Sequence, residues 1–461
     1  MVEVQNVSVV KQGKKTFDRL NWKIEEGEHW VISGNNGSGK TLLLELLAGK
    51  AQVSEGKVIY DFIQEKDWNA YFDALRSRIR YIPAHAAHAL LKKYQGLFYQ
   101  QRYYGSFNEG IPLVKDVFED KLKLVDALEL PGSFSIKNLL ELPLTRLSNG
   151  QFKKVLIILY LLEGDTRLLL LDYPFEGLDH ESREHLSTFI DHIALTQQLQ
   201  VILSDHYHEL PEVINRRLVI NDYKIETQGF YSAPAEKVST QKRDKPIHSK
   251  ADSPVVEMKD LRIQYGEKVI LKDFNWSVHQ GERWALVGKN GSGKTTLFSL
   301  IYADHPLAYS QQIYLFGKRR GSGESIWDIK RRINYLGPEL ISFMNPQGIR
   351  SKALDYIKQN YKTYNEEKLK HIISFFQSDS FVNKPVHQLS SGQLQLILLI
   401  QCFLDEKELL LLDEPFQFLD PKQKALVSRY MQQYLDEEKT LILVTHYQKD
   451  IDQWAEHIMK L

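Results

Sequence analysis

The sequence predicts an α/β fold that is built twice, with a mostly parallel core sheet in each copy. Three observations support this prediction. Short apolar runs alternate with longer amphipathic segments and are joined by glycine-rich turns, which is typical of a parallel sheet covered by helices. Four short motifs recur in the same order in both halves of the 461-residue chain. In each half, a glycine-rich loop joins an apolar strand to a helix.

Composition excludes several classes of protein. Charged residues make up 26% and aromatic residues 11% of the chain, so a collagen-like, mucin-like or wholly disordered chain is excluded. The 59 basic side chains balance the 59 acidic ones, so any binding to nucleic acid or anionic lipid would have to be local. The single cysteine, Cys402, cannot form an intrachain disulfide or build a zinc site alone, which indicates a reducing, intracellular compartment.

The N-terminus and the lengths of the apolar runs predict the cellular location of the chain. Residues 1–15 lack the apolar core and cleavage site of a signal peptide, and they alternate like a strand. The longest apolar runs, such as 155–162 and 394–400, are far shorter than the roughly 20 residues that a membrane-spanning helix requires. We therefore expect a cytoplasmic protein without a transmembrane segment, which could also lie peripherally at the inner face of a membrane.

The first repeated motif is the glycine-rich loop. It reads GNNGSGKT at 34–41 and GKNGSGKT at 288–295, after strands expected at 29–33 and 283–287 and before helices expected at 42–47 and 296–301. Its backbone N–H groups can converge on phosphates, its lysine can reach the β and γ phosphates, and its threonine can ligate Mg²⁺. The predicted nucleotide-binding residues are Gly34, Asn35, Asn36, Gly37, Ser38, Gly39, Lys40, Thr41, Gly288, Lys289, Asn290, Gly291, Ser292, Gly293, Lys294, Thr295 and Thr296.

Another repeated motif is a run of four leucines that ends in an aspartate, Asp172 in the first copy and Asp413 in the second. Such a run predicts a buried strand whose terminal carboxylate would hold the metal through water. Glu414 follows Asp413 and could accept a proton from the attacking water. Tyr173 stands there in the first copy, and its ordinary pKa near 10 excludes a general base at neutral pH. The second site is expected to hydrolyse and the first is not, unless Tyr173 is a neutral structural variant.

The repeat also predicts the domain boundaries. We expect one domain at 1–228 and another at 255–461, each of an ordinary domain size. Residues 229–254 between them are polar, poor in large aliphatic side chains and contain three prolines. Such a stretch cannot bury enough apolar surface to fold alone, so it predicts a linker.

Both copies resemble the nucleotide-binding domains of ATP-binding cassette (ABC) proteins. The family signature, Leu-Ser-Gly-Gly-Gln, is close to LSNGQ at 147–151 and LSSGQ at 389–393, in which Asn149 and Ser391 replace the central glycine. The resemblance covers nearly the whole chain outside the linker. It implies two P-loop NTPase domains in tandem, each with an antiparallel β subdomain and a helical subdomain beside the core sheet. It also implies ATP and Mg²⁺ as cofactors, with metal-binding residues Thr41, Asp172, Thr295 and Asp413.

In this family, two such domains enclose two ATP molecules head to tail, each phosphate loop facing the signature of the other domain. The signature supplies a serine hydroxyl and a glycine N–H at a helix N-terminus. The second site would contain Lys294, Thr295, Asp413, Glu414 and His446, closed by Ser148, Gly150 and Gln151. The first site would contain Lys40, Thr41, Asp172, Tyr173 and His206, closed by Ser390, Gly392 and Gln393. The residues expected to act in catalysis are Glu414, His446, Lys294, Lys40 and His206, the two histidines as sensors of the γ-phosphate.

Some positions depart from the family pattern or allow two interpretations. Tyr265 stands where the family stacks an aromatic ring on adenine, whereas the matching residue of the first copy is Lys11, so the first site would hold adenine more weakly or in a different way. Asp179 and Asp420 match the inter-domain loop of the family, and they could equally cap the helices that follow them.

The partner is a further question. The family has a glutamine that meets Mg²⁺ and couples to a membrane partner, but Ala84 and Pro338 stand there, and His85 or Glu339 could substitute. Segment 304–330 resembles the ModF type of tandem ATP-binding protein, a group associated with molybdenum transport and photorepair. This resemblance implies that the chain energises transport or remodelling through a separate partner, either a membrane permease subunit or another client. The alternative is a ribosome- or nucleic-acid-associated ABC ATPase, although in that class the linker is typically longer and both copies usually keep the glutamate.

Three basic segments bear on that alternative. Segment 92–104 interleaves aromatic and basic side chains, which could stack on bases or could pack within a helical subdomain. The clusters at 318–320 and 330–332 could be solvated or could form a docking face. An interaction protein without catalysis is a third possibility for the whole chain.

Overall fold

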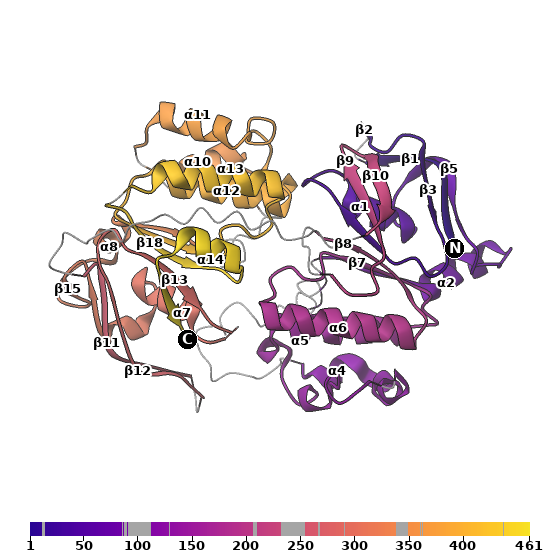
Figure 1. Cartoon of the computed structure of the whole chain (residues 1–461), viewed down its shortest axis with the longest axis horizontal. Coiled ribbons are helices and arrows are strands. Elements are labelled where there is room, and N and C mark those ends of the chain that lie inside the picture. The colour runs from indigo at the N-terminus through magenta and orange to yellow at the C-terminus, as the bar shows by residue number, and fades with distance from the viewer. Residues whose placement is uncertain are drawn as a thin grey trace. The chain divides into compact units, whose positions relative to one another are not determined.

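The computed structural model describes the chain except for residues 12–13, 85, 87–89, 91–111, 129, 206–209, 232–253, 266–267, 290, 338–348, 360, 362 and 437. The chain forms two compact units, residues 1–236 and 237–461. They are coloured indigo to magenta and orange to yellow in Figure 1. Each unit combines a mostly parallel sheet, an antiparallel sheet and helices, which confirms the predicted fold class.

The first unit contains two sheets. In its six-stranded core sheet, the strands lie in the order β10-β9-β4-β8-β7-β6, and all neighbours are parallel except β9 and β10. These strands are β4 (Trp30–Ser33), β6 (Ile79–Ile82), β7 (Leu168–Asp172), β8 (Gln200–Ser204), β9 (Arg216–Asn221) and β10 (Lys224–Phe230). The antiparallel sheet contains β1 (Val2–Lys11), β2 (Lys14–Lys15), β3 (Leu20–Ile24) and β5 (Val53–Tyr60).

The helices of the first unit cover the core sheet and extend it into a helical subdomain. They are α1 (Lys40–Leu47), α2 (Trp68–Arg78), α4 (Val114–Phe118), α5 (Asn149–Leu161) and α6 (His180–Thr196), with 3-10 turns at Glu119–Leu128, Lys137–Leu139 and Leu144–Arg146. The long helices α5 and α6 pack side by side (Figure 1). Segment 92–104, considered above for nucleic-acid binding, lies outside the described residues.

The second unit repeats this plan. Its parallel sheet has the order β16-β17-β18-β13-β19, and its antiparallel sheet has the order β12-β11-β14-β15. The strands are β11 (Val256–Tyr265), β12 (Lys268–Val278), β13 (Arg283–Val287), β14 (Gln312–Leu315), β15 (Lys318–Arg319), β16 (Ile333–Leu336), β17 (Leu409–Asp413), β18 (Thr440–Val444) and β19 (His457–Lys460). The helices are α7 (Lys294–Ile301), α8 (Ile326–Lys330), α10 (Ala353–Lys358), α11 (Glu366–Phe375), α12 (Ser391–Leu404), α13 (Pro421–Tyr434) and α14 (Gln448–Trp454).

The leucine runs are central parallel strands, as the sequence predicts. In β17, Leu410 and Leu412 pack into the cluster formed with α10 to α13, while Leu409 and Leu411 pack into the cluster formed with α7 and the antiparallel sheet. Successive side chains of a strand point to opposite faces, so a strand covered on both faces must be apolar at every position. The run ends in Asp413, whose side chain is also buried and whose Oδ2 lies 3.3 Å from Thr295 Oγ1.

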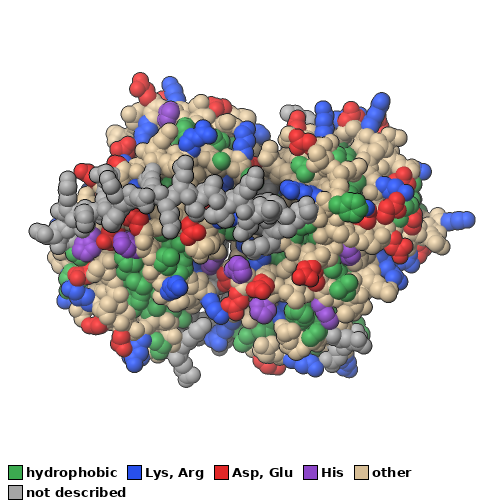
Figure 2. Space-filling view, viewed as in Figure 1, with side chains coloured by type: hydrophobic (Ala, Val, Ile, Leu, Met, Phe, Trp, Pro, Cys, Tyr) green, Lys and Arg blue, Asp and Glu red, His purple; other side chains and the backbone are tan. Residues whose placement is uncertain are grey.

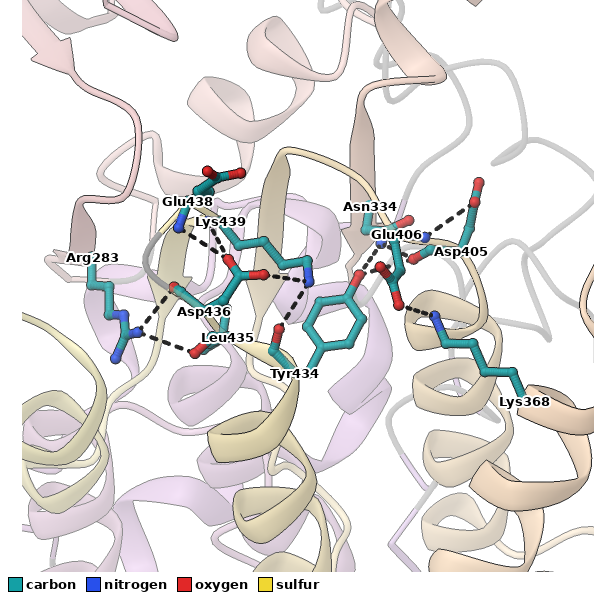
Figure 3. Close-up of polar contacts among 10 residues, drawn as sticks. All are labelled: Arg283, Asn334, Lys368, Asp405, Glu406, Tyr434, Leu435, Asp436, Glu438 and Lys439. Atoms are coloured by element: carbon teal, nitrogen blue, oxygen red, sulfur yellow. Dashed lines mark hydrogen bonds and ion pairs between the residues drawn. The ribbon is translucent and has the colours of Figure 1, made fainter. Parts of the chain in front are cut away.

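Polar contacts secure the opposite, amino end of this sheet (Figure 3). The hydroxyl of Tyr434, at the end of α13, donates to the carbonyl of Asp405 at 2.8 Å and accepts from the amide of Asn334 in β16 at 2.9 Å. Arg283, the first residue of β13, donates to the carbonyl of Leu435 at 3.4 Å. These bonds hold helix ends at the amino ends of the parallel strands. The phosphate loop follows the carboxyl end of β13, and Asp413 lies at the carboxyl end of β17.

The surface seen in Figure 2 agrees with the balanced composition. On the face shown in Figure 2, basic and acidic side chains are interspersed over both units. In the part of the chain that the structure describes, no helix is both long enough and apolar enough to cross a membrane. β10 ends at Phe230, just inside the stretch that the sequence predicts as a linker.

Candidate functional site

Each phosphate loop leads straight into its helix, which begins at the loop lysine, two residues before the start that the sequence predicted. Lys40 Nζ donates to the carbonyls of Gly34 and Asn35, at 2.7 Å each. Lys294 Nζ makes the matching bonds in the second unit, at 2.6 and 2.9 Å. The lysines are 3% and 7% exposed, so each is held against its own loop. This arrangement places one buried positive charge at each helix N-terminus.

Two glycines of the first loop are required by its geometry. A Cβ at Gly34 would lie 2.0 Å from the carbonyl oxygen of Ile220 in β9, so the loop can pass that strand only without a side chain. Gly39 caps α1 with a φ of 111°, in a region that L side chains rarely adopt. Gly293 has the same role before α7, with a φ of 104°. The loop shape is therefore fixed by backbone that only glycine permits.

The residues of each loop fit ATP with Mg²⁺. The hydroxyl oxygens of Ser38 and Ser292 are buried and have no hydrogen-bond partner among the described residues, so each can donate to a phosphate. Thr41 Oγ1 lies 2.9 Å from Asp172 Oδ2, and the matching hydroxyl in the second unit lies 3.3 Å from Asp413 Oδ2. Hydroxyl and carboxylate oxygens are the ligands that Mg²⁺ prefers.

The turn after each leucine-rich strand has the same backbone in both units. Tyr173 has a φ of 49° and Glu414 a φ of 50°, both in the left-handed region. The N–H of Tyr173 donates to the carbonyl of Ser204 at 3.2 Å, and the N–H of Glu414 donates to the carbonyl of Val444 at 2.9 Å. The two units therefore present different side chains from one shared turn.

The second unit brings two of its predicted catalytic residues, Glu414 and His446, together. Glu414 Oε1 lies 3.4 Å from His446 Nε2, and both side chains are mostly buried. In the first unit, Lys40 Nζ lies 5.7 Å from the centre of the Tyr173 ring, within the range of a cation–π contact. His206, the matching histidine, lies outside the described residues.

Both signature motifs lie at a helix N-terminus. Ser148 caps α5 and accepts from the N–H of Gln151 at 3.2 Å, while Gln151 Oε1 accepts from the N–H of Ser148 at 2.9 Å. Ser390 and Gln393 form the same reciprocal pair at the start of α12. A capped N-terminus of this kind presents N–H groups and the positive end of the helix dipole. Each signature therefore offers donors suited to a phosphate.

Asp179 and Asp420 are helix caps in the structure. Asp179 accepts from the N–H of Ser182 at 2.7 Å and starts α6. Asp420 accepts from the N–H of Gln423 at 2.8 Å and starts α13. The capping interpretation of these residues is thereby confirmed for each unit taken by itself.

Sequence reasoning missed a serine beside Asp172, the predicted metal ligand of the first unit. Ser204 Oγ donates to Asp172 Oδ1 at 2.6 Å and accepts from the N–H of Tyr173 at 3.0 Å, and the side chain is fully buried. Val444 occupies the equivalent place in β18, opposite Asp413 in the ladder. A position-by-position alignment of the two copies would have found this difference, because the serine stands two residues before the repeated histidine.

Two titratable side chains at the Tyr173 turn, Lys153 and Glu176, were also missed. Lys153 of α5 donates to the carbonyls of Pro174 and Glu176 at 2.7 and 2.6 Å. Burial lowers the pKa of the Lys153 ammonium to about 8 and raises the pKa of the Glu176 carboxyl to about 8, because burial disfavours the charged form of each group. The second unit has uncharged glutamines at both places, Gln395 and Gln417. The first site thus differs from the second in more than its missing glutamate.

The structure does not describe the side chains of several predicted site residues. The side chains of Tyr265 and Lys11 are not described, and Asn290, His85, Pro338 and Glu339 lie outside the described residues. Ala84 is described, and it lines a small pocket together with Asp172 and Tyr173. A short apolar side chain therefore lines the same pocket as Asp172, at the position where a glutamine was expected from the family resemblance.

Comparison with known families decides the identity of the fold. The family model described as ABC transporter matches twice, over residues 17–176 and 271–417. The chain belongs to the ABC transporter family. Both matches contain a phosphate loop, a signature and a leucine-rich strand, so the chain is a tandem ABC protein. Membership implies ATP binding, generally with Mg²⁺, and ATPase activity as a property of the family.

Several known proteins are similar to this chain over most of their length. The chain is 28% identical to the ABC transporter ATP-binding protein ModF of Escherichia coli, over 96% of this chain and 93% of that protein. It is 27% identical to an ABC transporter ATP-binding protein of Schizosaccharomyces pombe, over 98% of this chain and 95% of that one. An archaeal ribosome recycling factor, solved in complex with the ribosomal stalk protein, is 18% identical with a TM-score of 0.59, over 96% of this chain and 84% of that one. The last likeness concerns the fold alone.

Proposed function

We propose that this tandem ABC protein binds two ATP molecules between its halves, head to tail, and hydrolyses ATP mainly at the site built on the second phosphate loop. One observation carries this proposal most directly. The same left-handed turn presents Glu414 beside His446 in the second unit and Tyr173 in the first. A carboxylate can accept a proton at neutral pH, and a phenol cannot.

The phosphate loops and signatures would bind the nucleotide. Lys40 and Lys294 would meet the β and γ phosphates, and Ser38 and Ser292 would each contribute a hydroxyl donor. The signature residues of the other half would close each site: Ser148, Gly150 and Gln151 for the second, and Ser390, Gly392 and Gln393 for the first. This order of parts is supported by the position of both signatures at capped helix N-termini.

At the second site, Glu414 would accept a proton from the water that attacks the γ-phosphorus. The new bond joins the water oxygen to phosphorus, the bond to the β–γ bridging oxygen breaks, and ADP and phosphate are released. Mg²⁺, when bound, supplies charge neutralisation on the phosphates, and Thr295 and Asp413 are the residues that would hold it. His446 lies within reach of Glu414 and would keep that carboxylate aimed at the water.

At the first site, the chain would retain ATP rather than turn it over. Tyr173 offers no base, and its ring lies near the loop lysine. The additional hydrogen bond from Ser204 to Asp172 would steady the carboxylate that holds the metal. ATP held in this way would keep the halves associated while the second site cycles.

Turnover of single-site variants tests the asymmetry. Glu414→Gln keeps the size and polarity of the side chain but removes the base, so it should abolish most ATP hydrolysis and leave ATP binding intact, a loss of roughly a hundredfold or more. Tyr173→Phe should change turnover by less than about twofold, since no proton transfer depends on it. Steady-state hydrolysis and equilibrium ATP binding are measured for both variants. Equal losses in the two variants would rule out the asymmetric model.

For the partner, we propose a separate membrane permease subunit, to which the chain would attach at the inner face of a membrane. Similarity over nearly the full length to proteins named as ABC transporter ATP-binding proteins supports this choice. A pull-down with the tagged full chain, with and without ATP, should recover membrane-embedded subunits. Recovery of ribosomes instead would favour a role in translation and overturn the permease.

A further inference from the structure

Helix α12 connects two parts of the catalytic apparatus in the second unit. It begins at the signature, with Ser390 as its cap. One turn further on, Gln395 Nε2 donates to the carbonyl of Glu414 at 3.3 Å and to that of Pro415 at 3.0 Å. Gln395 is only 3% exposed, so water cannot easily replace these bonds. The signature end of α12 is therefore tied to the backbone that carries the proposed base.

The first unit keeps this connection with a different side chain. Lys153 stands at the same distance from its signature serine as Gln395 does. It donates to the carbonyls of Tyr173, Pro174 and Glu176, at 3.4, 2.7 and 2.6 Å. An amide in one copy and an ammonium in the other reach the same turn from the same place on the signature helix. The common feature is a donor that bonds the turn carbonyls, which indicates a role for the contact itself.

We propose that Gln395 is a positioning residue that transmits closure of the first ATP site to Glu414 in the second site. This inference rests on the proposed head-to-tail arrangement, in which Ser390, Gly392 and Gln393 close on the ATP of the first site. Gln395 lies on the same helical turn as Gln393, so a shift of this helix end on closure moves the Glu414 turn with it. In the first unit, the matching contact runs from Lys153 of α5 to the Tyr173 turn, and Tyr173 has no carboxylate. Only the contact made by Gln395 would therefore control hydrolysis.

The chain offers a matched control on the same helix. Gln401 Nε2 donates to the carbonyls of Tyr356 and Ile357, at 3.3 and 3.4 Å, and thus makes the same kind of contact with α10, away from the Glu414 turn. Gln395→Leu and Gln401→Leu remove equivalent bonds with similar change of shape. Gln395→Lys restores a donor of the kind that the first unit uses.

Steady-state kinetics of the full chain separate positioning from general loss of structure. Gln395→Leu should lower kcat roughly tenfold or more with the KM for ATP nearly unchanged, because it misplaces the base and leaves the phosphate loop intact. Gln401→Leu should leave both constants near their original values, and Gln395→Lys should recover most of kcat. Equal losses from the two leucine variants, or a Gln395→Leu defect confined to KM, would overturn the proposal.

A double-mutant cycle tests the transmission itself. Lys40→Ala removes ATP from the first site, and it should reduce kcat at the second site through α12. If Gln395 carries this effect, Lys40→Ala combined with Gln395→Leu should be no slower than the slower single variant. Losses that multiply would overturn transmission through Gln395. If Glu414→Gln fails to abolish turnover, the proposed function itself is wrong. If Glu414→Gln abolishes turnover but the kcat losses of Lys40→Ala and Gln395→Leu multiply, only the proposed role of Gln395 is wrong.

Discussion

At the residue scale, the two halves differ first in the residue that follows the aspartate of the leucine-rich strand. Tyr173 and Glu414 share a left-handed backbone and the same hydrogen bond to the neighbouring strand, so the exchange alters chemistry without altering shape. The sequence predicts this exchange, because each residue directly follows the aspartate of a repeated motif. Ser204 could not be predicted in the same way, because its contact with Asp172 joins neighbouring strands and depends on the ladder register.

The hydrogen bond from Ser204 to Asp172 leads to a prediction about the first site. Ser204→Val, which installs the residue found in the second unit, should weaken Mg²⁺-dependent ATP retention at the first site by roughly tenfold, because it frees the metal-site carboxylate. The measurement is a Mg²⁺ titration of ATP retained by a Lys294→Ala background, in which the second loop no longer competes. Ser204→Thr keeps the hydroxyl and serves as the control. Unchanged retention in Ser204→Val would refute the role of this bond.

At the element scale, the alternating strands and helices follow from periodicity, and their ends follow from local chemistry. The four leucines before each aspartate predict a doubly covered parallel strand, and both are found as such. The first helix begins at Lys40 rather than at 42, where its apolar periodicity begins, because Gly39 already accepts the hydrogen bond from the N–H of Leu43. A cap formed by backbone is not visible in a pattern of apolar side chains. The bridge from α12 to the Glu414 turn was likewise hidden, since glutamine in a helix has no distinctive signal.

Cys402 lies on the face of α12 that packs into the core of the second unit, and its burial gives a testable prediction. Burial raises the pKa of this thiol to about 12, and the thiolate is the reactive form. The fraction of thiolate therefore stays very low between pH 7 and 9, where an ordinary thiol with a pKa near 9 would become reactive. In the native chain, a thiol reagent should react with Cys402 only as the second unit unfolds, and within seconds once denaturant is added. Rapid reaction of the native chain at pH 8 would contradict this packing of α12.

At the scale of the whole molecule, the duplication puts two phosphate loops and two signatures on one chain. Because both halves belong to one chain, each is held at a high effective concentration relative to the other. ATP would then join halves that are already tethered, so closure would need no second chain. The duplication is evident from the sequence alone, whereas the partner is not, because that specificity would reside in another subunit.

The nucleotide content of the chain after turnover tests the asymmetric tandem ATPase most directly. The full chain is incubated with Mg²⁺ and ATP, separated rapidly from free nucleotide, and assayed for ATP and ADP per chain. We expect about two nucleotides per chain, with close to one as ATP, retained at the first site, and the other largely as ADP. Lys40→Ala should remove the retained ATP selectively. Nearly complete conversion of both nucleotides to ADP, or a Lys40→Ala variant that still retains ATP, would contradict the proposal.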